Sequence, residues 1–219
     1  LASSAASDVY KRQAVAEILR REGRIDILIN NAGFGISGAI EFTPPQEARR
    51  QFDVNFFGMV NMNRAVLPVM RQQGGGRIVN MSSVAAPIAI PFQAYYSASK
   101  AAVRTYSLAL ASEVRPFGIE VCVIMPGDIA TGFTAARRKS CGGDDVYNGR
   151  IARSVAVMEH DERTGMSAQF AGQFVARRAT QKHPKLICTM GRKYALFVFL
   201  MRILPTRTAT RIVGRIYAS

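Results

Sequence analysis

The sequence has few of the residues from which metal centres and disulfide frameworks are built. Its 219 residues include three cysteines and two histidines. Cys122, Cys141 and Cys188 lie far apart and never form a Cys-x-x-Cys pair, which indicates a reducing compartment and no disulfide framework. With only His160 and His183 beside them, the sequence predicts no metal site. We therefore expect a cytoplasmic protein whose cysteines serve in packing or lie at the surface.

Acidic residues are scarce, and the C-terminal quarter has none. The chain carries 29 Lys and Arg against 15 Asp and Glu, a net charge of +14, and after Glu162 eleven basic residues follow without one acid. Such an excess favours an anionic partner such as lipid headgroups, a phosphorylated cofactor or nucleic acid, while a solvated basic face is an equally good interpretation. Because no nucleic-acid motif and no aromatic-basic platform accompanies the charge, we expect no nucleic acid.

Long apolar runs are also missing. The run 195–201 is too short to cross a bilayer. It lies in a basic, apolar tail, residues 192–219, which suits either an interfacial helix that contacts a membrane or a helix packed over a pocket. Residues 1–7 lack the basic start and apolar core of a signal peptide. We interpret residues 1–13 as a non-native N-terminal segment, with a polar helix N-terminus as the alternative.

The rest of the chain alternates short apolar strands with helical segments. Apolar, β-branched runs predict strands at 24–30, 77–81, 119–125 and 185–190. Helical patterns predict helices at 14–22, 42–73, 92–115 and 167–180. This alternation predicts one α/β domain, residues 14–219, with a parallel sheet and right-handed crossovers. Residues 132–165 are polar and weakly patterned, which is typical of a substrate-binding loop.

Candidate ligand-binding residues follow the predicted strand ends. Ligands of such sheets bind beyond the carboxyl ends of the strands. Asn31, Ala32 and Gly33 follow one strand, Ser83 follows the next, and residues 126–131 follow a third. The small residues at 31–33 would let a ligand approach the backbone closely, although Asn and Gly are also ordinary turn formers. We expect all three groups at one edge of the sheet.

Tyr96 and Lys100 are a candidate proton-transfer pair. They lie four residues apart in a predicted helix, which places the ammonium beside the phenol. A nearby cation lowers the pKa of a phenol towards the range that a general acid or base needs, and Ser83 could donate to a carbonyl oxygen at the same place. With seven Tyr and six Lys in the chain, the pair alone also fits a core tyrosine and a solvated lysine.

Asn55 is an unfavourable residue for the interior of the predicted helix 42–73. Either it is an exposed polar residue, or its amide holds a backbone carbonyl or a water.

Together these motifs resemble the classical short-chain dehydrogenase/reductase family. The resemblance rests on five motifs in order, over roughly residues 14–131: Asn30-Asn31-Ala32-Gly33, Asn55, Ser83, Tyr96-Ser-Ala-Ser-Lys100 and Pro126-Gly127 with Thr131. It implies a Rossmann-type doubly wound parallel sheet and hydride transfer between a nicotinamide cofactor, NADP or NAD with NADP slightly favoured, and a small-molecule carbonyl or alcohol. The stretch from Gly165 onward is more loosely similar to the lipid-, retinoid- and steroid-type branch, which implies a hydrophobic substrate. A homo-oligomer is a further expectation.

The resemblance also implies roles for the catalytic residues. Tyr96 would donate or accept the proton, and Lys100 would lower its pKa and hold the nicotinamide ribose. Ser83 would polarise the substrate oxygen, and Asn55 would anchor a water of the proton relay.

The cofactor contacts follow from the same resemblance. The backbone of Asn31, Ala32 and Gly33 would line the adenosine side. Pro126 and Gly127 would lie beside the nicotinamide, and Ile129 and Thr131 would lie at its carboxamide.

The sequence departs from that family at one place. It contains no Thr-Gly-x-x-x-Gly-x-Gly turn to receive the pyrophosphate at a helix N-terminus, and roughly the first two strands are missing. We therefore expect an N-terminally truncated member. Two alternatives stay open: a non-catalytic remnant that cannot bind cofactor, and a basic peripheral-membrane protein.

Overall fold

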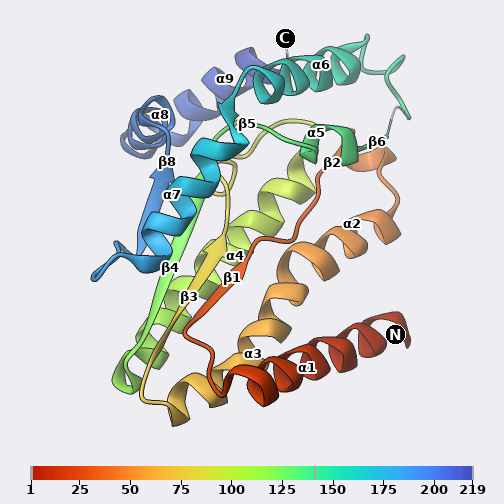
Figure 1. Cartoon of the computed structure of the whole chain (residues 1–219). Coiled ribbons are helices and arrows are strands. Elements are labelled where there is room, and N and C mark those ends of the chain that lie inside the picture. Colours follow the sequence, from red (N-terminus) through yellow and green to blue (C-terminus); the bar gives the residue numbers. More distant parts are fainter. Residues whose placement is uncertain (1, 141, 219) are drawn as a thin grey trace.

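A four-stranded parallel sheet forms the centre of the computed structural model, which describes residues 2–140 and 142–218 and so leaves Cys141 outside the described residues. The strands lie in the order β1-β3-β4-β8. Their bounds are Ile27–Asn30, Gly76–Met81, Ile119–Pro126 and Ile187–Met190. All four predicted strands are therefore confirmed, and their carboxyl ends meet at one edge (Figure 1).

The inner strands are buried because their apolar runs face helices on both sides. Ile78, Val79, Val123 and Ile124 are fully buried, as expected for a parallel sheet covered on both faces. β1 differs because it lies at the edge of the sheet and pairs only with β3. Ile29 of that strand is 43% exposed.

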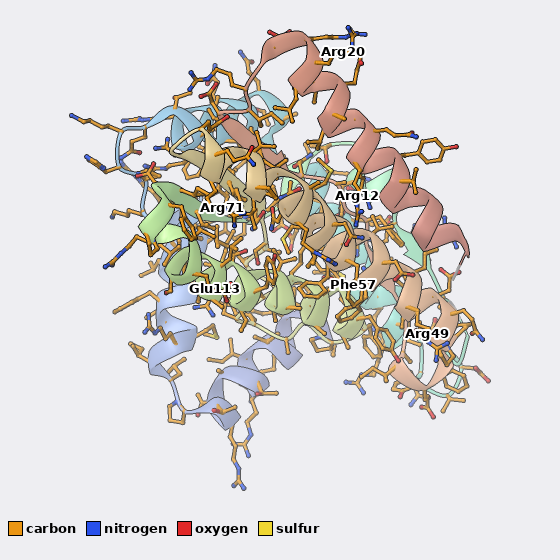
Figure 2. All side chains as sticks on the ribbon, turned by 90° about the horizontal axis from the view of Figure 1, so that it is seen from below. Arg12, Arg20, Arg49, Phe57, Arg71 and Glu113 are labelled. Atoms are coloured by element: carbon orange, nitrogen blue, oxygen red, sulfur yellow. The ribbon has the colours of Figure 1, made fainter. Side chains whose placement is uncertain are left out.

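Three helices cover one face of the sheet. They are α1 (Ala2–Glu22), α3 (Gly58–Gln72) and α4 (Ala94–Val114), seen from below in Figure 2. Val66 and Met70 of α3 pack with Leu110 of α4 against the sheet. α1 runs without a break from Ala2, so residues 2–13 continue the helix that the sequence predicts from residue 14.

α7 (Ala168–Thr180) covers the opposite face, where it packs against Cys122 and Cys188 of the sheet. The predicted helix 167–180 is confirmed, and Ser167 caps it by accepting a hydrogen bond from the backbone N–H of Phe170 at 3.1 Å. The result is a three-layer α/β/α arrangement of the Rossmann type.

The predicted helix 42–73 is interrupted. It consists of α2 (Pro45–Phe52), a π-helical turn η2 (Asp53–Phe57) and α3. Single π-turns inside α-helices are rare and frequent at functional sites. This one contains Asn55, the residue that the sequence marks as unfavourable in a helix.

The prediction of an irregular loop at 132–165 is wrong in its second half. α5 (Phe133–Ala136) and β6 (Arg138–Lys139) are short, but α6 (Arg150–Arg163) is a regular 14-residue helix. Its buried residues recur at helical spacing, and two of the four are polar or charged: Ile151, Ser154, Met158 and Glu162. Because an apolar stripe is the usual helix signal, this pattern escapes a search for hydrophobic periodicity.

The basic tail folds into two helices, α8 (Arg192–Ile203) and α9 (Thr206–Tyr217), separated by Pro205. Together with α6 they lie over the carboxyl edge of the sheet (Figure 1). Among the described residues, no helix has the length and apolar character to cross a membrane. Two short strand pairs complete the edge. β2 (Ile36–Ser37) pairs with β6, and β5 (Ile129–Ala130) pairs with β7 (Met166–Ser167).

Candidate functional site

A cavity of about 810 Å³ lies where the strands end. Its floor comes from Met81 at the end of β3 and Pro126 at the end of β4. α4, α7 and α8 supply its walls, and most of the lining is apolar. This is the carboxyl edge at which the sequence predicts ligand binding.

Ser83, Tyr96 and Lys100 all line this cavity. Ser83 lies just beyond β3, separated from it by Ser82, whereas Tyr96 and Lys100 lie one helical turn apart on α4. The Lys100 Nζ lies 5.8 Å from the centre of the Tyr96 ring and donates a hydrogen bond to Met81 O at 2.9 Å. The Ser82 hydroxyl donates to Lys100 O at 2.8 Å and thereby fixes the end of β3 to α4.

The Ser83 hydroxyl is held towards Tyr96. Ala85 N–H donates to Ser83 Oγ at 3.1 Å, and Ser83 is only 8% exposed. The side chains of Ser83 and Tyr96 form a hydrogen bond, which favours the phenolate of Tyr96. The two hydroxyls thus lie together at one point of the cavity wall.

The prediction that the pKa of Tyr96 is lowered is wrong. Burial raises the pKa of Tyr96 to about 12, and the bond to Ser83 offsets this only in part. Burial likewise lowers the pKa of Lys100 to about 8. Removing a side chain from water disfavours its charged form, so the same environment opposes both the phenolate and the ammonium. Tyr96 therefore stays protonated at neutral pH and is able to donate a proton.

Asn55 lies behind the cavity and does not line it. Its Nδ2 donates to Phe34 O at 3.0 Å, and its Oδ1 accepts from Phe34 N–H at 3.0 Å. Of the alternatives that the sequence leaves open, the structure confirms the amide that holds a backbone carbonyl. Asn55 Nδ2 also donates to Ser99 Oγ at 3.2 Å, which joins the loop after β1 to the helix of Tyr96.

Gly33 has a steric reason to be glycine. A Cβ at this position would lie 3.2 Å from Asn55 Oδ1 and 3.4 Å from Lys100 Nζ. The loop therefore passes close to both side chains because residue 33 has no side chain of its own.

The predicted cofactor residues lie mostly where the sequence places them. Those that line the cavity besides Tyr96 and Lys100 are Asn31, Gly33, Pro126, Gly127, Ile129 and Thr131. Ala32 does not line it. Asn30 lies away from it, in a polar network where its Nδ2 donates to Asn63 Oδ1 and Asn80 Oδ1, both at 2.8 Å.

Tyr194 is a cavity residue that the sequence does not predict. Its hydroxyl donates to Asp128 Oδ2 at 2.7 Å, and its ring lies so close to Gly127 that a Cβ there would be 2.3 Å from the ring. The turn after β4 is thereby fixed to α8. Nothing in the sequence links residues 127 and 194, because the contact depends on the placement of the tail.

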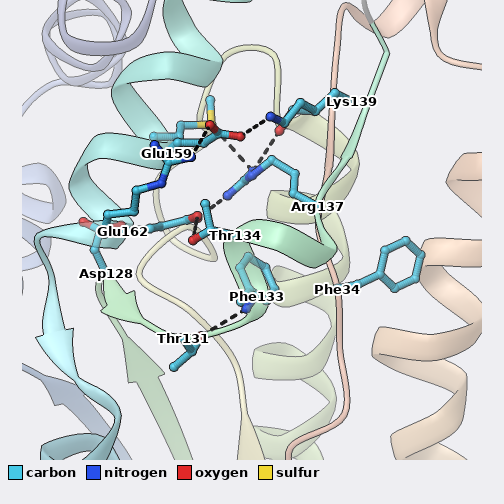
Figure 3. Close-up of polar contacts among 12 residues, drawn as sticks. Phe34, Asp128, Thr131, Phe133, Thr134, Arg137, Lys139, Glu159 and Glu162 are labelled. Carbon is cyan, nitrogen blue, oxygen red and sulfur yellow. Dashed lines mark hydrogen bonds and ion pairs between the residues drawn. The ribbon is translucent and has the colours of Figure 1, made fainter.

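A buried ion pair joins Glu162, which lines the cavity, to Arg137, which does not (Figure 3). The Arg137 guanidinium pairs with Glu162, and Thr134 Oγ1 donates to Glu162 Oε2 at 2.7 Å. Arg137 Nη1 also donates to Ser37 Oγ at 2.8 Å. Burial raises the pKa of Glu162, and the charge of Arg137 opposes that rise. The sequence gives no sign of this pair because its partners lie 25 residues apart in a charged, weakly patterned segment.

The residues present fit one half of a nicotinamide cofactor. The nicotinamide side has a hydroxyl pair, a lysine and a loop without a Cβ at Gly33. The phosphate side differs, because Gly33, Gly35 and Gly38 lead into β2 and the three-residue 3₁₀ helix η1 (Ile40–Phe42). Over the described residues that follow β1, the first α-helix, α2, begins only at Pro45, so no helix N-terminus lies directly after this loop to receive a pyrophosphate.

Comparison with known proteins gives the family. The family model for "short chain dehydrogenase" matches residues 4–142. The 3-ketodihydrosphingosine reductase of Bacteroides thetaiotaomicron is 44% identical over 187 residues, which are 84% of this chain and 70% of that protein. Dehydrogenase/reductase SDR family member 7B of Xenopus tropicalis is 35% identical over 201 residues, 91% of this chain and 62% of that protein.

Solved structures agree on the fold. A short-chain dehydrogenase from Streptomyces avermitilis superposes with a TM-score of 0.81 at 30% identity, covering 95% of this chain and 76% of that one. An enzyme from Burkholderia phymatum in complex with NAD gives a TM-score of 0.73 over 89% of this chain and 71% of that one, and its 20% identity supports the fold alone. This chain therefore belongs to the short-chain dehydrogenase family.

Proposed function

We propose that this oxidoreductase-family chain interconverts a carbonyl and an alcohol on an apolar substrate with a nicotinamide cofactor. One observation carries the proposal: the Ser83 and Tyr96 hydroxyls lie together on a cavity of about 810 Å³ that Lys100 also lines. The other walls of that cavity are mainly apolar. A hydroxyl pair in an apolar cavity suits a substrate with one polar, reactive oxygen.

Ser83 orients the substrate oxygen in this mechanism. Its Oγ accepts from Ala85 N–H, so its own hydrogen can be donated to a second acceptor. A donor fixed in advance stabilises negative charge that develops on a carbonyl oxygen, and it does so most strongly where water is excluded.

Tyr96 delivers the proton in the reducing direction. Its burial keeps the phenol protonated at neutral pH, so it can act as a general acid when the oxygen gains charge. In the oxidising direction the phenolate would take the proton back, and the raised pKa of Tyr96 makes this the less favourable direction at neutral pH.

Lys100 and the loops hold the cofactor. Lys100 Nζ lies between Met81 O and the Tyr96 ring, where its remaining hydrogens could bind the nicotinamide ribose. Ile129 and Thr131 would contact the carboxamide, and the backbone at 31–33 would contact the adenosine side. When bound, the nicotinamide supplies or accepts the hydride. NADP is the preferred form in this proposal, since the net charge of +14 suits the additional phosphate.

The substrate is proposed to be a lipid-like ketone or alcohol. Ala171 and Val175 of α7 and Phe197 of α8 line the same cavity as the hydroxyl pair. The 44% identity to a 3-ketodihydrosphingosine reductase supports a long-chain keto substrate over a sugar-like one.

Cofactor titration tests the proposal directly. NADPH and NADH are titrated separately into the purified chain, with nicotinamide fluorescence as the readout, and turnover is then measured with long-chain and short-chain ketones. We expect saturable binding, tighter for NADPH, and turnover of the long-chain ketone. Lys100→Met should weaken binding, whereas Arg115→Gln, which removes an exposed charge elsewhere, should leave it unchanged.

A non-catalytic role is the alternative that this titration can reveal. In that case neither cofactor binds at any concentration tested, although the chain remains folded. That outcome would reject hydride transfer for this chain and leave a member of the family without that activity.

A further inference from the structure

The outer side of α8 carries an exposed apolar stripe. Leu196, Phe199 and Ile203 are 60%, 58% and 61% exposed. Their spacing of three and then four residues places them on one face of the helix. Large side chains this exposed, gathered on one helix, mark a surface that meets another apolar phase.

The inner side of the same helix is apolar too. Tyr194 is 8% exposed, and Phe197 lines the cavity. A helix that is apolar on all sides is normally buried on all sides. The described residues cover only the inner side of α8 and leave its outer stripe open to a partner.

Positive charge surrounds this stripe in the sequence. The tail 192–219 contains six basic residues and no acidic one. Arg192, Lys193 and Arg202 lie at the ends of α8. On α9 the exposed residues Arg207, Arg211 and Arg215 follow each other at intervals of four, which places them on one face of that helix.

This charge decides between the two candidate partners of the stripe. A second copy of the chain would bring six cations against six cations with no acid to pair them. An anionic lipid surface complements both features at once, because acyl chains take up the apolar side chains and headgroups attract the arginines.

We propose that α8 and α9 form a membrane-docking surface, with α8 lying in the plane of an anionic bilayer. Leu196, Phe199 and Ile203 enter the acyl boundary, while the arginines of α9 contact the headgroups. The docking is interfacial, since no described helix can span the membrane. α8 then lies between the bilayer on its outer side and the cavity on its inner side. The proposal does not depend on hydride transfer.

A single fluorescent reporter tests the insertion of α8. The chain contains no tryptophan, so Phe199→Trp introduces the only one. With vesicles of phosphatidylcholine and phosphatidylglycerol, we expect its emission to shift to the blue and to be quenched by brominated lipid. Ile40→Trp, at an equally exposed position (60%) outside the tail, should show neither change. Equal behaviour of the two reporters would overturn the proposal.

Matched triple variants test which side chains bind. Leu196→Ser, Phe199→Ser and Ile203→Ser together should weaken vesicle co-sedimentation roughly tenfold or more, because each loses the burial of a large apolar side chain. Ile40→Ser, Phe117→Ser and Val146→Ser, which remove exposed apolar side chains elsewhere, should not. Both variants should keep the thermal unfolding midpoint of the native chain, since all six positions face solvent.

Arginine variants distinguish docking on a lipid surface from contact with a second copy of the chain. Replacing Arg207, Arg211 and Arg215 by Gln should weaken binding about 100-fold on anionic vesicles, at about fivefold for each arginine, and added salt should weaken the native chain similarly. Arg49→Gln, Arg71→Gln and Arg115→Gln together form the control of equal charge. If either tail variant binds anionic vesicles as tightly as the native chain, the proposal is overturned. A native dimer that the triple-serine variant dissociates, with no vesicle binding, would overturn it as well.

Discussion

Asn55 and Phe34 exchange two hydrogen bonds, each 3.0 Å long, between a side-chain amide in the π-turn and the backbone of the loop after β1. The π-turn thus has a structural purpose, because it directs the amide of Asn55 at a loop that lines the cavity. A loop held in this way keeps Gly33 against Lys100.

Replacing Asn55 by Ala should lower the free energy of unfolding by about 1–3 kcal/mol, because the part-buried Phe34 N–H would lose its acceptor. Gln51→Leu is the matched comparison. Gln51 Nε2 also donates to Phe34 O, but its own Oε1 has no hydrogen-bond partner, so an apolar residue of similar size should change stability by less than about 1 kcal/mol. Urea denaturation of both variants measures this, and equal losses would contradict the clamp.

Gly127→Ala should destabilise the protein by about 1–3 kcal/mol. The added Cβ would lie 2.3 Å from the Tyr194 ring, so α8 must shift from the turn after β4. Gly214→Ala is the control inside α9, where a Cβ meets no atom within 4 Å, and it should stabilise by about 0.5–1 kcal/mol. Thermal denaturation distinguishes them, and a neutral Gly127→Ala would mean that Tyr194 does not pack on this turn.

Glu162→Gln should lower the free energy of unfolding by about 3–5 kcal/mol. The fully buried Arg137 side chain would lose the carboxylate with which it pairs. Asp26→Asn, which breaks the exposed pair with Arg24, should cost less than about 1 kcal/mol. Guanidinium chloride is a salt and would screen both ion pairs, so urea is used as the denaturant. Similar losses of stability in the two variants would show that burial of the Arg137–Glu162 pair has no energetic consequence.

Lys100 should make stability depend on pH. Burial lowers its pKa from 10.5 to about 8. Between these values the unfolded chain binds a proton that the folded chain does not, so the contribution of Lys100 to stability rises with pH across this interval. Below about pH 8 both states hold the proton, and the folded state bears the full cost of a buried ammonium.

Lys100→Met removes this titration. The stability of the native chain relative to the variant should therefore increase as the pH is raised from about 8 towards 10. Measurements stay below pH 10 because burial raises the pKa of Tyr96 from 10.0 to about 12. Over that pH interval the contribution of Tyr96 to stability falls as the pH rises. A pH-independent difference between native chain and variant would contradict the burial of Lys100 as a charged group.

The sequence predicts those features whose signals are local. Apolar runs locate the four strands, and the Tyr96–Lys100 spacing places both residues on one helix face. The rule that parallel strands present ligand sites at their carboxyl ends then brings Ser83 to the same edge. Each of these inferences uses neighbours in the chain together with one property of the fold.

The remaining features depend on contacts between distant segments. α6 is hidden because Glu162, on its buried side, is a charged residue paired with Arg137. Tyr194 contacts Gly127 only because the tail folds back over the sheet. The direction of the Tyr96 pKa shift depends on how deeply the phenol is buried, which spacing alone does not reveal.

Proton transfer at Tyr96 is tested by comparing Tyr96→Phe with Tyr95→Phe, a substitution of its neighbour on the same helix. The measured quantities are NADPH affinity and turnover of a long-chain ketone. We expect Tyr96→Phe to retain cofactor affinity and to lose turnover by at least about 100-fold, and Tyr95→Phe to retain both. Undiminished turnover in Tyr96→Phe would contradict the placement of proton transfer at this hydroxyl.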